Sequence, residues 1–244
     1  MMLNIAQREW QAAFLSPLAW GLLAANQFIL AWIFLRVLEH FSGLEAAQRS
    51  AGLTLELSLN LFSFAAVLLL LSVPPLAMRM ISGELREGTF NLLGAAPVSL
   101  TEILLGKFLG LASIVTILTL LPLLMGLLLA SFVEQLDLGL LAAATLGLWL
   151  CGWLFAAVGL FASSLSTQPG VAAVAAYGIL ILLSVIGHTG GESAGTLFAW
   201  LSWNEHLFWF LLGTVRAADL LYFLLFTVFF LALAHRRLAN RRLG

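Results

Sequence analysis

The chain has 244 residues, of which 62% are hydrophobic and 9% are charged, and its mean hydropathy is +1.05. Soluble domains are closer to half apolar and a quarter charged, so this composition excludes an ordinary soluble enzyme and indicates a polytopic membrane protein. The single cysteine, Cys151, excludes an intramolecular disulfide. The four histidines lack metal-ligand spacing, so we expect no metal site. We also expect no nucleic-acid partner.

Residues 1–16 predict an amphipathic helix lying along the membrane interface. Its apolar residues share one face: Leu3, Ala6, Trp10, Ala13 and Phe14. A signal peptide is disfavoured, because no small-residue cleavage site is present and the following apolar run is too long. Ser16-Pro17 is typical of a helix cap with proline at the first helical position, and it opens a first membrane span at residues 18–37.

Five more apolar segments predict further spans, and residues 1–244 form a single membrane domain. These segments are residues 57–78, 103–129, 138–161, 170–186 and 220–234. Proline predicts a kink in the second span, at Pro74-Pro75, and in the third, at Pro122. Small residues at Ala143, Gly147 and Cys151 indicate a face for close helix packing, whereas the GxxxG pair of Gly106 and Gly110 is a weak signal of the same kind.

Residues 79–101 are rich in charge and are predicted to form a cytoplasmic loop between the second and third spans. The loop also holds an apolar stripe at helical spacing: Ile81, Leu85 and Leu92. Such a stripe favours a short surface helix with one side free for a partner, although a solvated loop whose charges only fix topology is the alternative. Ser99 and Glu102 have the spacing of a capping box, so the next helix is expected to begin there.

The same loop resembles the cytoplasmic loop of ABC-type-2 permeases, the membrane subunits of one class of ABC transporter. The matching residues are Glu84, Arg86, Glu87, Gly88, Thr89, Ala96, Pro97, Val98, Ser99, Thr101, Glu102, Ile103, Gly106 and Lys107. In that family the loop forms a coupling helix that docks on the ATPase subunit. The resemblance therefore implies an ATPase-coupling site made by Glu84, Leu85, Arg86, Glu87, Gly88, Thr89 and Leu92.

The resemblance also implies the partners. Two copies of an ABC ATPase subunit would bind the ATP and Mg, and a second permease subunit would be a copy of this chain or a relative. An auxiliary membrane or periplasmic subunit is left open. The N-terminal phrase REWQAAFLSPLAW, residues 8–20, is similar to the gliding-motility-type branch of the family.

Residues 188–218 predict an external re-entrant pair of half-helices. The Trp-rich stretch 196–212 is shorter than the roughly 20 residues that a crossing helix needs. Three polar residues interrupt it: Asn204, Glu205 and His206. Ser202 stands three residues before Glu205, as in a capping box, and Gly213 is a natural helix stop.

Glu205 and His206 are the candidates for a substrate path or an external gate, although a helix cap at the wet interface is the simpler interpretation. Arg216 and Asp219 are spaced for a local ion pair at the outer rim. No residue of the chain is predicted to be catalytic.

Positive charge orients the predicted spans. Six spans with both termini in the cytoplasm place eight Lys and Arg inside and three outside, in agreement with the positive-inside rule. The inside set is Arg8, Arg79, Arg86, Lys107, Arg236, Arg237, Arg241 and Arg242. The sequence thus predicts an all-α integral membrane fold of six transmembrane helices, with the interfacial helix, the coupling helix and the re-entrant hairpin, in the bacterial cytoplasmic (inner) membrane.

The predicted function is the permease subunit of an ABC exporter or extruder. The chain has no G-x-x-x-x-G-K-[ST] loop, so ATP binding is expected on another chain. A non-ABC carrier or a structural membrane subunit is one alternative, but carriers usually place ionisable residues at the midplane, and the middles of spans two to six have none. An intramembrane hydrolase is the other, but no G-x-S-x-G elbow occurs, and His188 and His206 are expected near the outer face.

Overall fold

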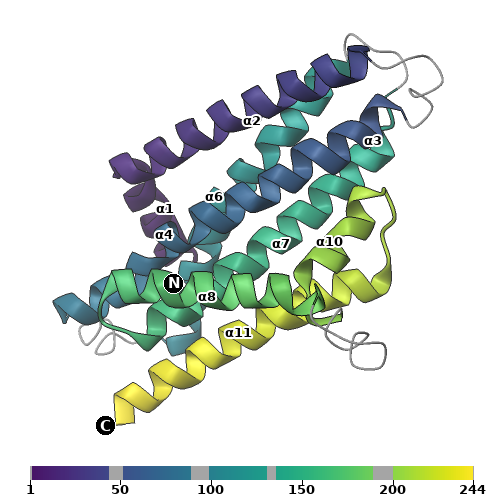
Figure 1. Ribbon diagram of the computed structural model, residues 1–244. Helices are drawn as coiled ribbons and strands as arrows, with labels where there is room; N and C mark the ends of the chain where they lie inside the picture. The colour runs from purple at the N-terminus through teal and green to yellow at the C-terminus, as the bar shows by residue number, and fades with distance from the viewer. Residues whose placement is uncertain (1, 44–51, 89–98, 131–135, 189–199, 244) are drawn as a thin grey trace.

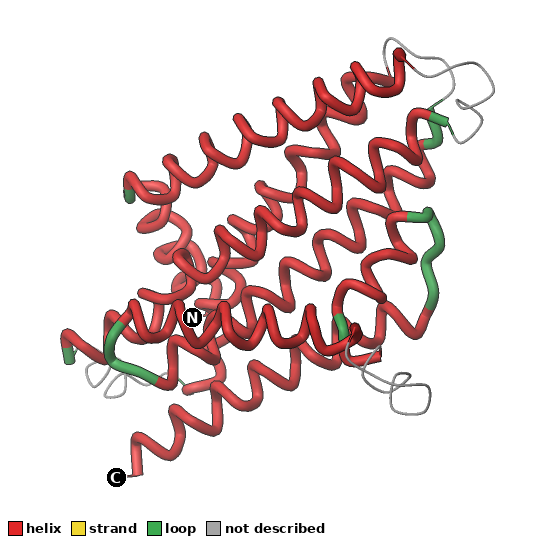
Figure 2. Tube along the Cα trace, in the orientation of Figure 1, coloured by secondary structure: helices red, strands yellow, loops and turns green. Residues whose placement is uncertain are grey.

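The protein is a bundle of helices (Figure 1) in a computed structural model that describes residues 2–43, 52–88, 99–130, 136–188 and 200–243. In chain order the helices are α1 (Met2–Leu15), α2 (Pro17–Gly43), α3 (Leu53–Leu57), the π-helix η2 (Ser58–Phe62), α4 (Ser63–Glu87), α6 (Leu100–Ala130), α7 (Leu138–Leu165), α8 (Pro169–Val185), the short η3 (Ile186–His188), α10 (Trp203–Leu211) and α11 (Ala217–Leu243). The described ranges contain no strand, and short turns join their helices (Figure 2).

Within the described residues, five helices are long and apolar enough to cross a membrane: Pro17–Gly43, Leu53–Glu87, Leu100–Leu129, Leu138–Leu165 and Ala217–Arg241. The predicted all-α membrane fold is therefore confirmed. The helix of the predicted fifth span, α8, is apolar but has only 17 residues, a length of about 25 Å against about 30 Å of bilayer hydrocarbon. The six-span count thus stays a prediction.

Helix α7 lies at the centre of the bundle, between α4, α6, α8, α10 and α11 (Figure 1). The predicted small-residue face is fully used there, since Ala143, Gly147 and Cys151 are all buried. A Cβ atom at Gly147 would lie 2.4 Å from the Cβ of Phe210, so only glycine lets α10 approach this closely. Cys151 is a small packing residue in this face.

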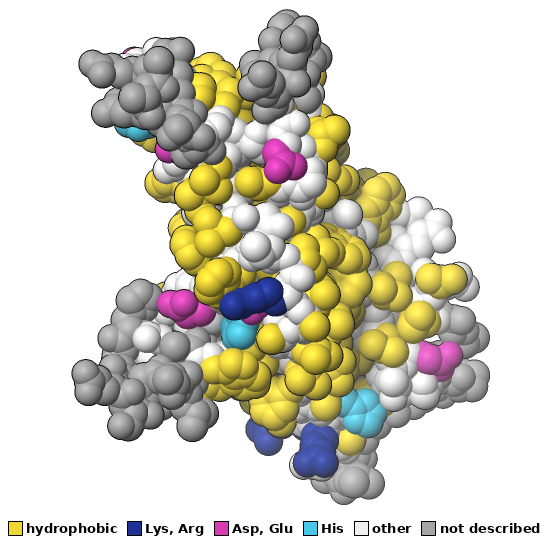
Figure 3. Space-filling model, turned by 90° about the vertical axis from the view of Figure 1, so that its right-hand side faces the viewer, with side chains coloured by type: hydrophobic (Ala, Val, Ile, Leu, Met, Phe, Trp, Pro, Cys, Tyr) yellow, Lys and Arg dark blue, Asp and Glu magenta, His cyan; other side chains and the backbone are white. Residues whose placement is uncertain are grey.

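The outer surface of the bundle suits contact with lipid. Large apolar side chains are exposed along the long helices: Trp20, Phe28 and Trp32 on α2, and Leu221, Val228 and Phe229 on α11. The face in Figure 3 is a broad hydrophobic surface on which charged side chains occupy only a few separate places. A soluble protein rarely exposes such an area, so the composition and the surface agree on a membrane protein.

Helix α4 ends later than predicted, and this corrects the start of the predicted loop. We expected the span to stop at residue 78, but the helix continues to Glu87 and ends at Gly88, whose φ of 71° is the left-handed value of a helix C-cap. The prolines do not interrupt it. Pro75 has no N–H to donate to the carbonyl of Leu71, and the Tyr177 hydroxyl of α8 donates to that carbonyl instead, at 2.6 Å.

The segment between α8 and α11 agrees only in part with the prediction. Helix α10 begins after Ser202 and ends before Gly213, whose φ is 79°, so both predicted boundaries are confirmed. The predicted capping-box pair is wrong. The Ser202 hydroxyl donates to the carbonyl of Ser184 on α8, and Glu205 is exposed. Residues 189–199 lie outside the described residues, so the re-entrant path stays a prediction.

Candidate functional site

The residues predicted to dock on an ATPase lie on the last turns of α4. Arg86 and Glu87 are exposed, whereas Leu85 is half-buried and packs against the hydrophobic core. Gly88 caps the helix, and Thr89 and Leu92 lie outside the described residues. The part of the proposed docking surface that the structure describes is thus a charged helix end and not a separate surface helix.

Glu84 faces into the protein. Its Oε1 lies 2.7 Å from Nζ of Lys107 on α6, and 3.5 Å from a guanidinium nitrogen of Arg8 on α1. The Glu84 side chain is only 14% exposed, so its charge serves contacts within the chain. Among the predicted docking carboxylates, Glu87 is therefore the one that the described structure presents at the surface.

Lys107 is the centre of this charged cluster. Its side chain is 2% exposed and donates a second hydrogen bond, also of 2.7 Å, to Oε1 of Glu9 on α1. A buried ammonium costs several kcal/mol unless carboxylates pair with it, and here two carboxylates do. We call Arg8, Glu9, Glu84 and Lys107 the ion cluster. It joins α1, α4 and α6 at one end of the bundle.

Two glycines let α1 lie close to α6. A Cβ at Gly106 would stand 2.8 Å from the Cβ of Ile5, and a Cβ at Gly110 would stand 2.7 Å from the Cβ of Glu9. The predicted GxxxG pair is therefore a packing face, and its partner is the N-terminal helix of the same chain. The close approach brings the carboxylate of Glu9 to Lys107, which directly follows Gly106 and lies about one turn before Gly110 on the helix.

A serine on α7 holds the same part of α4. The Ser163 hydroxyl accepts hydrogen bonds from the backbone N–H groups of Ile81, at 3.2 Å, and Ser82, at 3.0 Å. It donates to the carbonyl of Met78 at 2.9 Å. These contacts are buried, so the charged end of α4 is joined to the central helix as well as to the ion cluster.

A cleft of about 590 Å³ lies beside the ion cluster, between α1, the end of α4 and the start of α8. Its lining includes the charged residues Arg8, Glu9, Arg79, Glu84, Arg86 and Glu87. A surface of both signs of charge favours a protein partner with a complementary charge pattern. Across the described ranges, no three or more His, Cys, Asp and Glu residues gather in a way that could hold a metal ion.

The two residues of the second predicted site, Glu205 and His206, have different environments. Glu205 is exposed, whereas His206 is buried, with Nδ1 2.7 Å from Oδ1 of Asp219 and Nε2 2.9 Å from the carbonyl oxygen of Trp200. Its ring also stacks on Tyr222 at 3.9 Å between centroids. Both ring nitrogens are thus occupied, which makes His206 a poor candidate for the base of an intramembrane hydrolase.

The predicted ion pair of Arg216 and Asp219 is confirmed and is part of a larger arrangement. The guanidinium donates from Nε to Oδ2 at 2.7 Å and from Nη2 to Oδ1 at 3.1 Å, and it stacks over the ring of Trp209 at 3.9 Å. The Asp219 side chain is fully buried and also meets His206. His206, Arg216 and Asp219 together join α10 to α11, which indicates a structural role for them.

Sequence reasoning missed the ion cluster, because its members come from distant segments, and in the second group it found the Arg216–Asp219 pair but not the contact of Asp219 with His206. Glu9 and Lys107 are 98 residues apart, and only the small residues flanking Lys107 hinted at a close helix contact there.

Comparison with known protein families matches residues 3–243 to the family described as ABC-2 family transporter protein. This match confirms the resemblance that the loop residues carried, while the gliding-motility-type branch stays a prediction. No curated protein matches the chain.

Proposed function

The chain belongs to the ABC-2 family of transporter proteins, and from this membership we propose that it is the permease subunit of an ABC exporter or extruder. In this proposal the chain is not an enzyme by itself. A separate ATPase subunit binds the ATP and Mg, and this chain converts the resulting motion into movement of a substrate. The observation that supports the role is the exposed charged end of α4, at Arg86 and Glu87, beside the charged cleft.

The proposed docking surface consists of Arg86, Glu87, Gly88, Thr89 and Leu92, with the half-buried Leu85 at its inner edge. Glu84, which the resemblance also assigned to it, has a different part: it joins the docking end of α4 to Lys107. A force applied to residues 88–99 would act on α4 and α6 together, because the ion cluster connects the last turns of α4 to the first turns of α6.

The proposed assembly has two ATPase subunits and two permease subunits in the bacterial inner membrane. Both termini and residues 88–99 face the cytoplasm in this proposal, with six crossings and the segment 188–218 on the outer side. The distribution of Lys and Arg supports this orientation.

Pull-down of the ATPase by detergent-solubilised permease tests the docking surface. Leu92→Asp should weaken assembly by about 2 kcal/mol or more, as expected for a buried interface anchor. Glu87→Lys should weaken it in a salt-dependent way, because exposed charge pairs are screened. Glu39→Lys is the matched control, since it makes the same charge change at an exposed site on α2.

ATP turnover and export are measured on the same variants. If Leu92→Asp and Glu87→Lys bind, hydrolyse ATP and export like the unmodified protein, the segment is only a tether between two helices. The assignment of Glu84 to the inside is checked separately, because Glu84→Lys should lower the thermal stability of the permease alone, without any ATPase present.

A further inference from the structure

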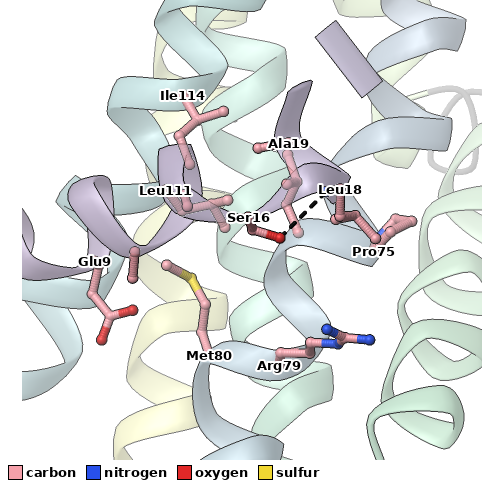
Figure 4. Close-up of a pocket in the computed structure, with 12 residues that line it drawn as sticks. Glu9, Ser16, Leu18, Ala19, Pro75, Arg79, Met80, Leu111 and Ile114 are labelled. Carbon is pink, nitrogen blue, oxygen red and sulfur yellow. Dashed lines mark hydrogen bonds between the residues drawn. The ribbon is translucent and has the colours of Figure 1, made fainter. Parts of the chain in front are cut away.

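A second, smaller cleft of about 230 Å³ lies between α1, the start of α2, α4 and α6 (Figure 4). Most of its lining is apolar and comes from all four helices: Ala12, Ala19, Pro75, Met80, Leu111 and Ile114. Arg79 stands at one end of this lining, on α4, with Glu9 on the α1 side. The cleft thus combines an apolar floor with a cationic end.

Arg79 is an exposed cation without a carboxylate partner in the described part of the chain. Three acidic residues line the clefts with it: Glu9 and Glu84, which both bind Lys107 at 2.7 Å, and the exposed Glu87, for which no ion pair with Arg79 is found. The charges of Glu9 and Glu84 are compensated inside the ion cluster by Lys107 and Arg8. The cation at the end of the cleft is therefore available to an anion from outside.

The order of charged and apolar residues along the cleft matches that of one bilayer leaflet, with charge at one end and apolar side chains towards the other. Arg79 lies two turns before the end of α4, on the charged side, while Pro75 and Ile114 continue into the apolar bodies of α4 and α6. The amphipathic helix α1 forms one wall, as expected for a segment at the headgroup boundary. An arginine at that level holds its guanidinium among the headgroups while its stem lies on apolar surface.

We propose that this cleft binds one anionic phospholipid, with the phosphate at Arg79 and the first part of one acyl chain on the apolar floor. Basic pockets between membrane helices on the cytoplasmic side recognise such headgroups. A free phosphate would not use the apolar floor. A zwitterionic lipid, whose phosphate is accompanied by an ammonium group of its own, would be attracted less strongly to the guanidinium. The cleft is smaller than the roughly 300–1,000 Å³ that encloses a drug-sized ligand, so the rest of the lipid stays in the bilayer.

Native mass spectrometry tests the site on protein purified from nanodiscs of phosphatidylglycerol and phosphatidylcholine. The unmodified chain should retain phosphatidylglycerol in preference to phosphatidylcholine. Arg79→Gln should lower that retention about fivefold, which is ~1 kcal/mol. Arg79→Lys should keep most of it. Arg237→Gln, on the exposed surface of α11, is the matched control and should retain the lipid like the unmodified chain.

The apolar half of the site has its own variant. Ala12 is exposed and lines the floor, so Ala12→Phe fills the cleft without entering the packed core and should lower phosphatidylglycerol retention even though Arg79 is intact. Unchanged retention in Arg79→Gln or in Ala12→Phe, or an equal loss in Arg237→Gln, overturns the proposal. Displacement of the lipid by soluble glycerol phosphate would also overturn it, in favour of a simple anion site.

Discussion

Lys107→Met removes the charge at the centre of the ion cluster and keeps a side chain of similar length. Two carboxylates, Glu9 and Glu84, would then face each other without the ammonium that separates them, and both side chains are less than 15% exposed. Removal of one partner from a buried ion pair costs about 3–5 kcal/mol, because the remaining charge stays buried and unpaired. For a chain of this size, that cost lowers the melting temperature by roughly 6–20 °C.

Thermal unfolding of the detergent-solubilised chain, followed by size-exclusion chromatography, measures this loss. Arg36→Met is the control, since the Arg36 and Glu39 side chains are 66% and 73% exposed and such pairs contribute about 0–1 kcal/mol. Adding Glu9→Gln and Glu84→Gln to Lys107→Met should restore most of the stability, because no buried charge is then left unpaired. If Lys107→Met and Arg36→Met melt together, the ion cluster does not hold α1, α4 and α6.

Three further substitutions test the contacts that hold the bundle. Gly110→Leu should displace α1 and make it more accessible to protease, at a cost of about 1–3 kcal/mol, whereas Gly178→Leu, with nothing within 4 Å of its Cβ position, should not. Asp219→Ala should destabilise the protein by about 3 kcal/mol in thermal unfolding, because Arg216 and His206 lose a buried acceptor. Glu39→Ala removes an exposed pair of the same i, i+3 spacing and should cost less than about 1 kcal/mol. Tyr177→Phe should cost about 1 kcal/mol, since it leaves a backbone acceptor of α4 without its donor, and an unchanged melting temperature would contradict that role.

The starts of two helices, α2 and α6, were predictable from local signals. The capping box of Ser99 and Glu102 forms as expected, with hydrogen bonds of 3.0 to 3.2 Å between the two residues. Ser16 accepts from the N–H of Leu18 at the start of α2. Both signals lie within a few residues of sequence, so no knowledge of the tertiary structure is needed to read them.

The sequence predicts a span that ends at residue 78, where the charged residues begin, and a separate surface helix after it, whereas α4 continues without a break to Glu87. A membrane helix ends where its capping residue stands, here Gly88, and it can continue into the cytoplasm beyond the apolar span. The carbonyl that Pro75 leaves without a backbone donor is satisfied by Tyr177, which is more than 100 residues away in the sequence, so no local pattern predicts this contact.

The candidate site was predictable as a segment but not as individual contacts. Glu84 and Glu87 look equivalent in the sequence, three residues apart on one helix. The structure distinguishes them, since Glu84 meets Lys107 and Glu87 is exposed. That difference depends on the positions of α1 and α6, which no local pattern of the α4 segment specifies. The same holds for His206, whose partner Asp219 belongs to the next helix.

The division of roles between neighbouring residues has a mechanical consequence. In the proposed function, Glu87 contacts the ATPase and Glu84 contacts Lys107, so the docking contact and the internal contact are one helical turn apart on the same rigid element. Ser163 holds the preceding turns of α4, at Met78, Ile81 and Ser82, to α7. In the proposed function, a displacement at the docking end of α4 therefore reaches α1 and α6 through the ion cluster and α7 through Ser163, and α7 is the centre of the bundle.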